Sequence, residues 1–142
     1  MPEAEPLQQF GVLPYRLGAG GEIHILLITS RDTQRWVVPR GNPIDGLAPH
    51  QSAVQEAWEE AGIIGAVMSE PIGNYCYAKR KKDGSVMPAF VDLFPFQIDE
   101  QNNDWPERGE RETRWFDREA AAEAVDEPDL KQLIRAFSPE RG

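Results

Sequence analysis

The chain has 142 residues, of which 40% are hydrophobic and 27% are charged, and such values are typical of one soluble globular domain. Its formal net charge of −9 argues against binding to nucleic acid or to an anionic membrane, so an anionic substrate would need a local basic patch or a bound cation. The single cysteine excludes an internal disulfide, and the start of the chain lacks the basic and apolar segments of a signal peptide, so we expect a cytoplasmic protein.

The first third of the chain predicts a tail followed by strands. Residues 1–6 are acidic and rich in proline, so we expect a disordered tail there and a single domain over residues 7–142. Runs of apolar and β-branched residues predict three strands, over residues 8–17, 22–30 and 36–39. Residues 40–46 contain two glycines and a proline, which predicts a loop after the third strand.

A helix is predicted from Pro49 to the residue before Gly62, because proline suits the first helical turn and glycine the position after the last one. On a helical wheel the apolar residues gather on one side, which is formed by Val54, Ala57, Trp58 and Ala61. The opposite arc carries three carboxylates, those of Glu56, Glu59 and Glu60. The helix is therefore expected to bury one face and to present the carboxylates on the other.

The second half of the chain predicts a hairpin, a strand and two helices. The hairpin strands cover residues 72–78 and 86–98, and the connection KRKKDGS between them contains an Asp-Gly turn signal. Residues 99–111 are polar and irregular. A short strand and two helices follow, over residues 113–117, 117–125 and 128–137. This order predicts an α/β fold of the α+β type, in which a mixed β-sheet is sandwiched between helices.

The three carboxylates of the predicted helix have two interpretations. One is a solvated polar face, which is the usual role of charged residues on an amphipathic helix. The other is a site for a hard divalent cation, Mg²⁺ or Mn²⁺, which takes oxygen ligands from carboxylates, water and phosphate. Without a cation the arrangement is unfavourable, because Glu56 has like charges at i+3 and i+4. Glu59 and Glu60 also lie near the negative end of the helix dipole, where an acid costs roughly 0.3–1 kcal/mol.

The segment from Gly41 to Ile63 resembles the Nudix box. The pattern of that box is glycine, five residues, glutamate, seven residues, and then Arg-Glu-hydrophobic-x-Glu-Glu-x-Gly-hydrophobic. The matching positions in this chain are Gly41, Glu56, Glu59, Glu60, Gly62 and Ile63. Outside the box, the surroundings of WVVP, the basic hairpin and RWF resemble more loosely the diphosphoinositol-polyphosphate phosphohydrolase branch of the Nudix hydrolases. The resemblance covers most of the chain and implies the Nudix fold, a mixed sheet between helices.

The resemblance also implies roles for the glutamates. Glu56 and Glu60 would hold the divalent metal ion, with Glu59 and the backbone carbonyl of Arg40 as further candidate ligands. Glu59 would orient or deprotonate the attacking water, and Glu56 is the second candidate for this catalytic role because members of the superfamily differ over the base. The implied enzyme is a pyrophosphohydrolase that cleaves a phosphoanhydride linkage with Mg²⁺ or Mn²⁺ as its cofactor.

Two positions depart from the Nudix box, since Leu47 stands where a glutamate is expected and Gln55 where an arginine is expected. In the family these two residues pair, and the arginine helps to fix the catalytic glutamate. Loss of both partners strands no charge, so the fold is expected to survive, but a glutamine cannot offer a carboxylate the charged fork of an arginine. The alternative hypothesis is therefore a Nudix-fold binding or regulatory protein with little catalysis.

The basic residues of this acidic chain indicate where a phosphate-rich substrate would bind. The run KRKK at residues 79–82 is either a solvated hairpin tip or a cap that attracts phosphate toward the metal. The residues predicted to contact substrate are Arg31, Arg40, Gly41, Lys79, Arg80, Lys82 and Arg111. The candidate substrates are diphosphoinositol polyphosphates, dinucleoside polyphosphates, inorganic polyphosphate and nucleoside diphosphate sugars. We expect a small-molecule partner, no nucleic acid and no membrane, and the pattern specifies no oligomeric state.

Overall fold

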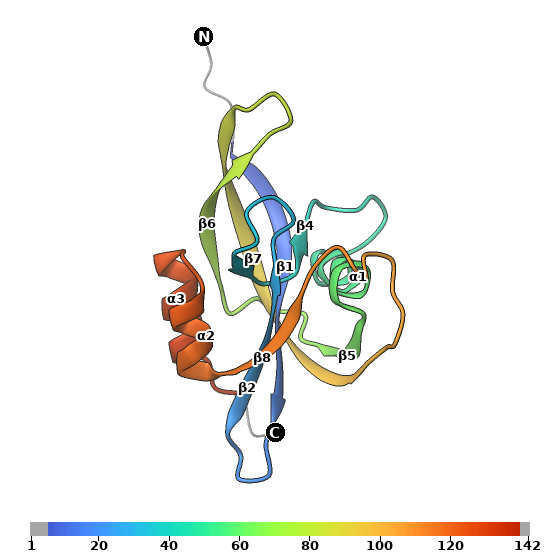
Figure 1. The fold of residues 1–142 in the computed structure, drawn as a ribbon, viewed down its shortest axis with the longest axis vertical. Helices are drawn as coiled ribbons and strands as arrows, with labels where there is room; N and C mark the ends of the chain where they lie inside the picture. Colours follow the sequence, from blue (N-terminus) through green and yellow to red (C-terminus); the bar gives the residue numbers. More distant parts are fainter. Residues whose placement is uncertain (1–5, 140–142) are drawn as a thin grey trace.

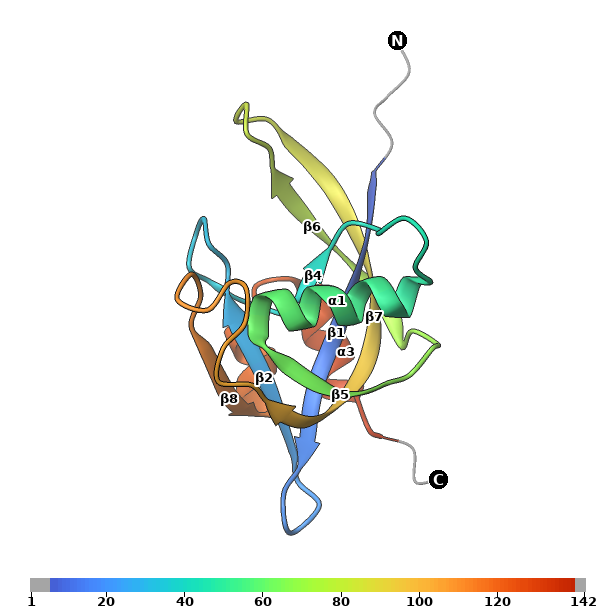
Figure 2. The same ribbon diagram turned by 90° about the vertical axis from the view of Figure 1, so that its right-hand side faces the viewer.

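The computed structural model describes residues 6–139 and shows one mixed β-sheet with helices on both of its faces (Figure 1). Helix α1 (Pro49–Ala61) lies on one side, and helices α2 (Arg118–Ala124) and α3 (Pro128–Ala136) lie on the other (Figure 2), which confirms the predicted fold class. Residues 1–5 of the predicted tail lie outside the described residues, so its disorder and the single-domain organisation stay predictions. No helix between residues 6 and 139 has the length and apolar composition that crossing a membrane requires.

The strands of the sheet within residues 6–139 are β1 (Leu7–Leu17), β2 (Ile23–Thr29), β3 (Trp36–Val37), β4 (Arg40–Gly41), β5 (Ile63–Val67), β6 (Gly73–Arg80), β7 (Val86–Gln101) and β8 (Thr113–Asp117). The central order is β3-β2-β1-β7-β5, while β4 pairs with β1, β6 with β7 and β8 with β2. Strands β1 and β7 run parallel, with paired residues from Leu7 and Ala89 to Tyr15 and Gln97. This long pairing joins the first and second halves of the chain.

The sheet separates two hydrophobic cores. On one face the strands pack against Ala53, Ala57 and Ala61 of α1, whose small side chains let the helix approach the sheet closely. On the other face the strands pack against α2 and α3, where Leu130 and Ile134 are fully buried. Because both faces are covered, each central strand is apolar on both sides, and the helices are held at fixed positions relative to the strand ends.

Both ends of α1 are fixed by local sequence. At its start, the side-chain oxygen of Gln51 accepts a hydrogen bond from the backbone N–H of Ala48 at 2.8 Å. At its end, Gly62 adopts a left-handed backbone conformation with φ of 66°, which glycine tolerates best. The ring of Trp105 packs so closely on Gly62 that a Cβ atom there would collide with it. The helix therefore ends at one defined place, and this sets the position of the glutamates in its last turns.

The predicted helices agree with the structure to within one residue at each end. The larger differences between prediction and structure concern strands. Strand β5 was not predicted, because a five-residue strand with a central glycine follows directly on the helix. Strand β4 has only two residues and lies in the segment predicted to be a loop. Strand β6 continues to Arg80, beyond its predicted end at residue 78, so Lys79 and Arg80 lie on a strand instead of in the turn.

Candidate active site

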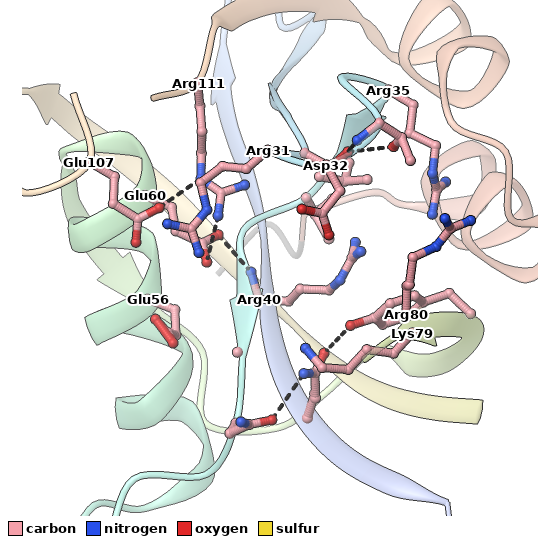
Figure 3. A pocket seen from close by; sticks show the side chains of 18 of the residues that line it. Arg31, Asp32, Arg35, Arg40, Glu56, Glu60, Lys79, Arg80, Glu107 and Arg111 are labelled. Carbon is pink, nitrogen blue, oxygen red and sulfur yellow. Dashed lines mark hydrogen bonds and ion pairs between the residues drawn. The ribbon is translucent and has the colours of Figure 1, made fainter. Parts of the chain in front are cut away.

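A polar cavity of about 480 Å³ opens beside α1 (Figure 3). Its walls come from α1, β4, β6, the loop after β2 and the segment before β8. The lining contains six Arg or Lys and five Asp or Glu side chains, although the whole chain has a net charge of −9. The basic members are Arg31, Arg35, Arg40, Lys79, Arg80 and Arg111, and the acidic members are Asp32, Glu56, Glu59, Glu60 and Glu107. The cavity is thus a local exception to the acidic character of the protein.

The three glutamates predicted to bind metal all line this cavity. Glu56 is half-buried and lies against Gly41, where a Cβ atom would collide with its carboxylate. Glu59 accepts a hydrogen bond of 2.8 Å from the side-chain amide of Gln55. Glu60 is only 7% exposed, and its Oε1 accepts a hydrogen bond of 3.2 Å from the backbone N–H of Arg40. The fold therefore brings together the residues that the sequence singled out.

The burial of Glu60 corrects the helical-wheel prediction, which placed all three carboxylates on a face opposite the buried one. The buried residues of α1 are Ser52, Ala53, Ala57, Glu60 and Ala61. Trp58, which was predicted to lie on the apolar face, is only partly buried. The physical reason is that β4 lies against α1 and covers Glu60, whose carboxylate is satisfied there by the Arg40 backbone N–H.

Burial and crowding raise the pKa of two of these carboxyl groups. Burial raises the pKa of Glu60 to about 8, with neighbouring Arg111 acting against this shift and repulsion from Glu56 adding to it. Burial, followed by repulsion from Glu59 and Glu107, raises the pKa of Glu56 to about 7. A divalent cation among these oxygens would relieve the repulsion and favour the ionised carboxylates.

The oxygen donors around the cavity suit a hard divalent cation such as Mg²⁺ or Mn²⁺. Within the described residues, however, no three acidic, histidine or cysteine side chains already converge on one point. Glu59 is turned toward Gln55 and Glu60 toward the Arg40 N–H. The donor chemistry of the cavity fits the predicted metal.

Arg111 links the carboxylates of α1 to a further one from the segment before β8. Its side chain is 10% exposed and pairs with Glu107 at 2.9 Å and with Glu60 at 3.6 Å. It also donates a hydrogen bond of 3.1 Å to the backbone carbonyl of Thr29. Arg111 was predicted to contact substrate, and it does line the cavity, but its guanidinium is already engaged by protein groups. Its contacts indicate that it neutralises and positions Glu60 and Glu107.

A basic wall faces the carboxylates across the cavity, and it consists of Arg35, Arg40, Lys79 and Arg80. Figure 3 shows Arg35, Lys79 and Arg80 on the side of the cavity opposite Glu56 and Glu60. The guanidinium of Arg40 lies 3.8 Å from the centre of the Tyr77 ring and donates a hydrogen bond of 3.3 Å to the Tyr75 hydroxyl. Arg35 is anchored by Glu127, whose carboxylate lies 2.9 Å away. Arg35 and Arg40 are therefore held in place before any ligand binds.

Of the remaining residues predicted to contact substrate, some line the cavity and one does not. Gly41 lines the cavity beside Glu56. Arg31 also lines it, and its guanidinium pairs with Glu110 at 3.0 Å. Lys82 does not belong to the lining, so its contact with substrate stays a prediction. It lies exposed in the hairpin turn beyond β6, because the turn carries the chain away from the cavity after Arg80.

The lining residues that sequence reasoning missed include Gln9, Asn42, Tyr77 and Glu107. Gln9 and Tyr77 lie on strands, where the pattern shows which side chains share a face but not which part of the strand borders a cavity. Glu107 lies in the irregular segment before β8, whose path the sequence does not specify. Of these four residues, only Asn42 could have been suspected from the sequence, since it directly follows the glycine of the Nudix box.

The sequence model of the NUDIX domain family matches residues 8–137 of the chain. Nudix hydrolase 12 of Arabidopsis thaliana, a mitochondrial protein by name, is 28% identical over 152 aligned residues. This alignment covers 92% of the present chain and 74% of the relative. The match to the family thus includes all three glutamates and both sides of the cavity.

Two solved structures share the fold. The Ap4A hydrolase of C. elegans superposes with a TM-score of 0.67 at 22% identity, over 92% of this chain and 95% of that one. The dihydroneopterin triphosphate pyrophosphohydrolase of E. coli superposes with a TM-score of 0.70 at 17% identity, over 94% of this chain and 97% of that one. These coverages show that the shared fold extends over most of the chain.

Proposed function

Because the chain belongs to the Nudix family of pyrophosphohydrolases, we propose that it uses this cavity to cleave a phosphoanhydride linkage in a phosphate-rich substrate, with a divalent metal ion as cofactor. One observation carries the proposal. Glu56, Glu59 and Glu60 line one side of a cavity whose other side is the basic wall. Metal-binding oxygens and phosphate-binding cations therefore share one space of about 480 Å³.

We assign the metal ion to Glu56 and Glu60, with Glu59 and the backbone carbonyl of Arg40 as further oxygen ligands. When bound, a divalent ion neutralises charge on the phosphate oxygens during the displacement. The hydrogen bond from Gln55 holds Glu59 at the edge of the cavity, where this carboxylate can orient or deprotonate the attacking water. Glu56 is the second candidate for that role.

The basic wall supports a substrate with several phosphate groups. The planar forks of Arg35 and Arg40 suit phosphate oxygens, and Lys79 adds a point charge. Among the described lining residues the one aromatic ring is that of Tyr77, and the Arg40 guanidinium stacks on it. A nucleobase is thereby denied an obvious stacking face, so we favour a diphosphoinositol polyphosphate, followed by a dinucleoside polyphosphate. On the same grounds we propose that the chain belongs to the diphosphoinositol-polyphosphate phosphohydrolase branch.

We further propose that the partner is a small molecule, and neither nucleic acid nor a membrane. The negative net charge of the chain supports this, since the positive charge of the lining is confined to a cavity. The cytoplasmic location stays a prediction, because the Arabidopsis relative is named as mitochondrial.

A Nudix-fold binding protein with little catalysis is the second candidate function. The observation that favours it is that Glu59 accepts its hydrogen bond from the uncharged amide of Gln55, at a position where the family has a charged arginine. The three intact glutamates favour the enzyme, because a binding site for phosphate alone gains nothing from three carboxylates beside it.

A turnover assay over a panel of diphosphate-linked compounds, with and without Mg²⁺ or Mn²⁺, separates the two candidates. We expect metal-dependent phosphate release by the wild-type protein and its loss in Glu60→Gln. The matched control is Glu123→Gln, which removes an exposed carboxylate of α2 and should keep full turnover. Tight binding of a compound without release of phosphate by the wild-type protein would overturn the enzymatic proposal.

A further inference from the structure

Three polar side chains at the cavity form a hydrogen-bonded chain that the assigned roles do not explain. The hydroxyl of Tyr77 donates to Oε1 of Gln9 at 2.6 Å, and Nε2 of Gln9 donates to Oδ1 of Asn42 at 3.0 Å. We call this chain the Tyr77–Gln9–Asn42 relay. We propose that Asn42 is a phosphate-binding residue and that the relay orients its side-chain amide toward the ligand; the inference rests on the proposed function only in that the cavity receives phosphate.

The direction of the relay follows from its first member. A phenol hydroxyl has one proton to donate, and the guanidinium of Arg40, which lies 3.8 Å from the centre of the Tyr77 ring, weakens the hydroxyl oxygen as an acceptor. Tyr77 therefore donates, and Gln9 accepts through its carbonyl oxygen. Gln9 is only 2% exposed, so both ends of its amide need partners, and Tyr77 and Asn42 supply them.

This direction determines which end of Asn42 is free. Because Gln9 presents its NH₂ group, Asn42 accepts with its carbonyl oxygen, and its own NH₂ group is left with both protons. Among the described residues, no hydrogen bond uses that nitrogen as a donor, and Asn42 is exposed and lines the cavity. An amide NH₂ group is a donor that suits a phosphate oxygen.

Strand pairing explains why Asn42 lies beside Gln9. Strand β4 pairs antiparallel with β1, with Phe10 opposite Gly41 and Gly11 opposite Arg40. Continuing this register by one residue places Asn42 opposite Gln9. Asn42 thus follows Gly41, which adjoins Glu56, and it is two residues from Arg40 of the basic wall. A donor at this place would contact phosphate between the carboxylates and the wall.

The competing interpretation is that the relay only stabilises the pairing of β1 and β4. The two interpretations differ in what they predict for ligand affinity. A structural relay would affect the melting temperature alone. A relay that orients Asn42 would affect the affinity for phosphate, and removing the Tyr77 hydroxyl would have no further effect once Asn42 is gone.

Calorimetric binding of inorganic tripolyphosphate in the presence of EDTA tests this, because no metal and hence no turnover is involved. The variants are Tyr77→Phe, which keeps the ring that Arg40 stacks on, Asn42→Ala, and the double variant. Tyr15→Phe is the matched control, since it removes a tyrosine hydroxyl from the core on the α3 side of the sheet.

We expect Asn42→Ala to weaken tripolyphosphate binding by about tenfold and Tyr77→Phe by about threefold. The double variant should bind like Asn42→Ala, and Tyr15→Phe like the wild-type protein. Unchanged affinity in Asn42→Ala, additive losses in the double variant, or absence of tripolyphosphate binding by the wild-type protein would each overturn the proposal. A protein that binds in this pattern but shows no metal-dependent turnover would contradict the proposed enzyme and leave the relay supported.

Discussion

Glu56 borders the cavity because the residue beside its carboxylate, Gly41, has no side chain. A methyl group at position 41 would occupy the space of that carboxylate and push it aside. We therefore expect Gly41→Ala to weaken Mn²⁺ binding by about 10- to 100-fold, as observed when the support of a metal ligand is lost. Electron paramagnetic resonance during a Mn²⁺ titration would measure the change.

A matched control for this substitution is Gly20→Ala, in the exposed turn between β1 and β2. There the nearest atom to an added Cβ is the end of the flexible Glu22 side chain, so Mn²⁺ binding should not change. If Gly41→Ala bound Mn²⁺ as tightly as the control, Glu56 would not belong to the metal site.

The raised pKa values of two glutamates predict a dependence of stability on pH. The pKa is about 7 for Glu56 and about 8 for Glu60, against an ordinary value of 4.5, so folding favours their protonated forms. This stabilisation is fully present below about pH 4.5 and is lost as the pH rises through about 7 to 8. In EDTA the protein should therefore melt at a lower temperature at about pH 8.5 than at about pH 6.

Metal should reverse this trend, because a divalent ion binds the deprotonated carboxylates. We expect Mg²⁺ or Mn²⁺ to raise the melting temperature more at about pH 8.5 than at about pH 6. The variant Glu60→Gln should show a flatter pH profile in EDTA than the wild-type protein. A wild-type melting temperature in EDTA that rises between these two pH values would contradict the assigned burial of the two carboxyls.

Among the secondary-structure elements, strand β6 determines by where it ends which residues of the basic run at 79–82 line the cavity. Lys79 is on the strand and lines the cavity, whereas Lys82 lies in the exposed turn. For a substrate that the protein turns over, Lys79→Ala should raise KM by about tenfold, because a charge-assisted phosphate contact is lost. Lys82→Ala changes the net charge equally and should leave KM within about twofold of the wild-type value. Equal effects of the two substitutions would show that the run acts only through its net charge.

The elements that sequence reasoning found and those it missed differ in the strength of their signals. Helix α1 was predicted to its last residue, because Pro49 and Gly62 are strong start and stop signals. Strand β8 was predicted with its observed bounds from its aromatic and β-branched residues. The two-residue strand β4 has too few residues for any periodicity, and its pairing with β1 is set by tertiary contacts. This missed strand is also the one that buries Glu60 and places Asn42.

At the scale of the whole molecule, the cavity is assembled from segments that lie far apart in the sequence. The carboxylates could be predicted because they share one helix and a fixed spacing. The partners of Arg111 could not be predicted, since Thr29, Glu60 and Glu107 come from three separate segments. The Tyr77–Gln9–Asn42 relay likewise joins strand β6, strand β1 and the segment after β4. Sequence spacing therefore singled out the glutamates that we assign to the metal ion, whereas the long-range contacts that orient them required the structure.

The molecule as a whole is acidic, with a net charge of −9, whereas the cavity lining combines six basic with five acidic side chains. The basic wall would attract an anion to its side of the cavity. The parallel pairing of β1 and β7 supports this arrangement, because it holds the α1 side and the β6 side of the cavity in one rigid sheet.

The most direct test of the account is a crystal structure of the protein with Mn²⁺ and inorganic tripolyphosphate, with the metal located by its anomalous scattering. We expect an anomalous peak within coordination distance of carboxylate oxygens of Glu56 and Glu60, at roughly 2.0–2.3 Å. The phosphate chain should extend from that ion toward Arg40 and Lys79. A peak elsewhere, or tripolyphosphate bound without any ion beside these glutamates, would contradict the assignment of the cavity as a metal-dependent phosphoanhydride site.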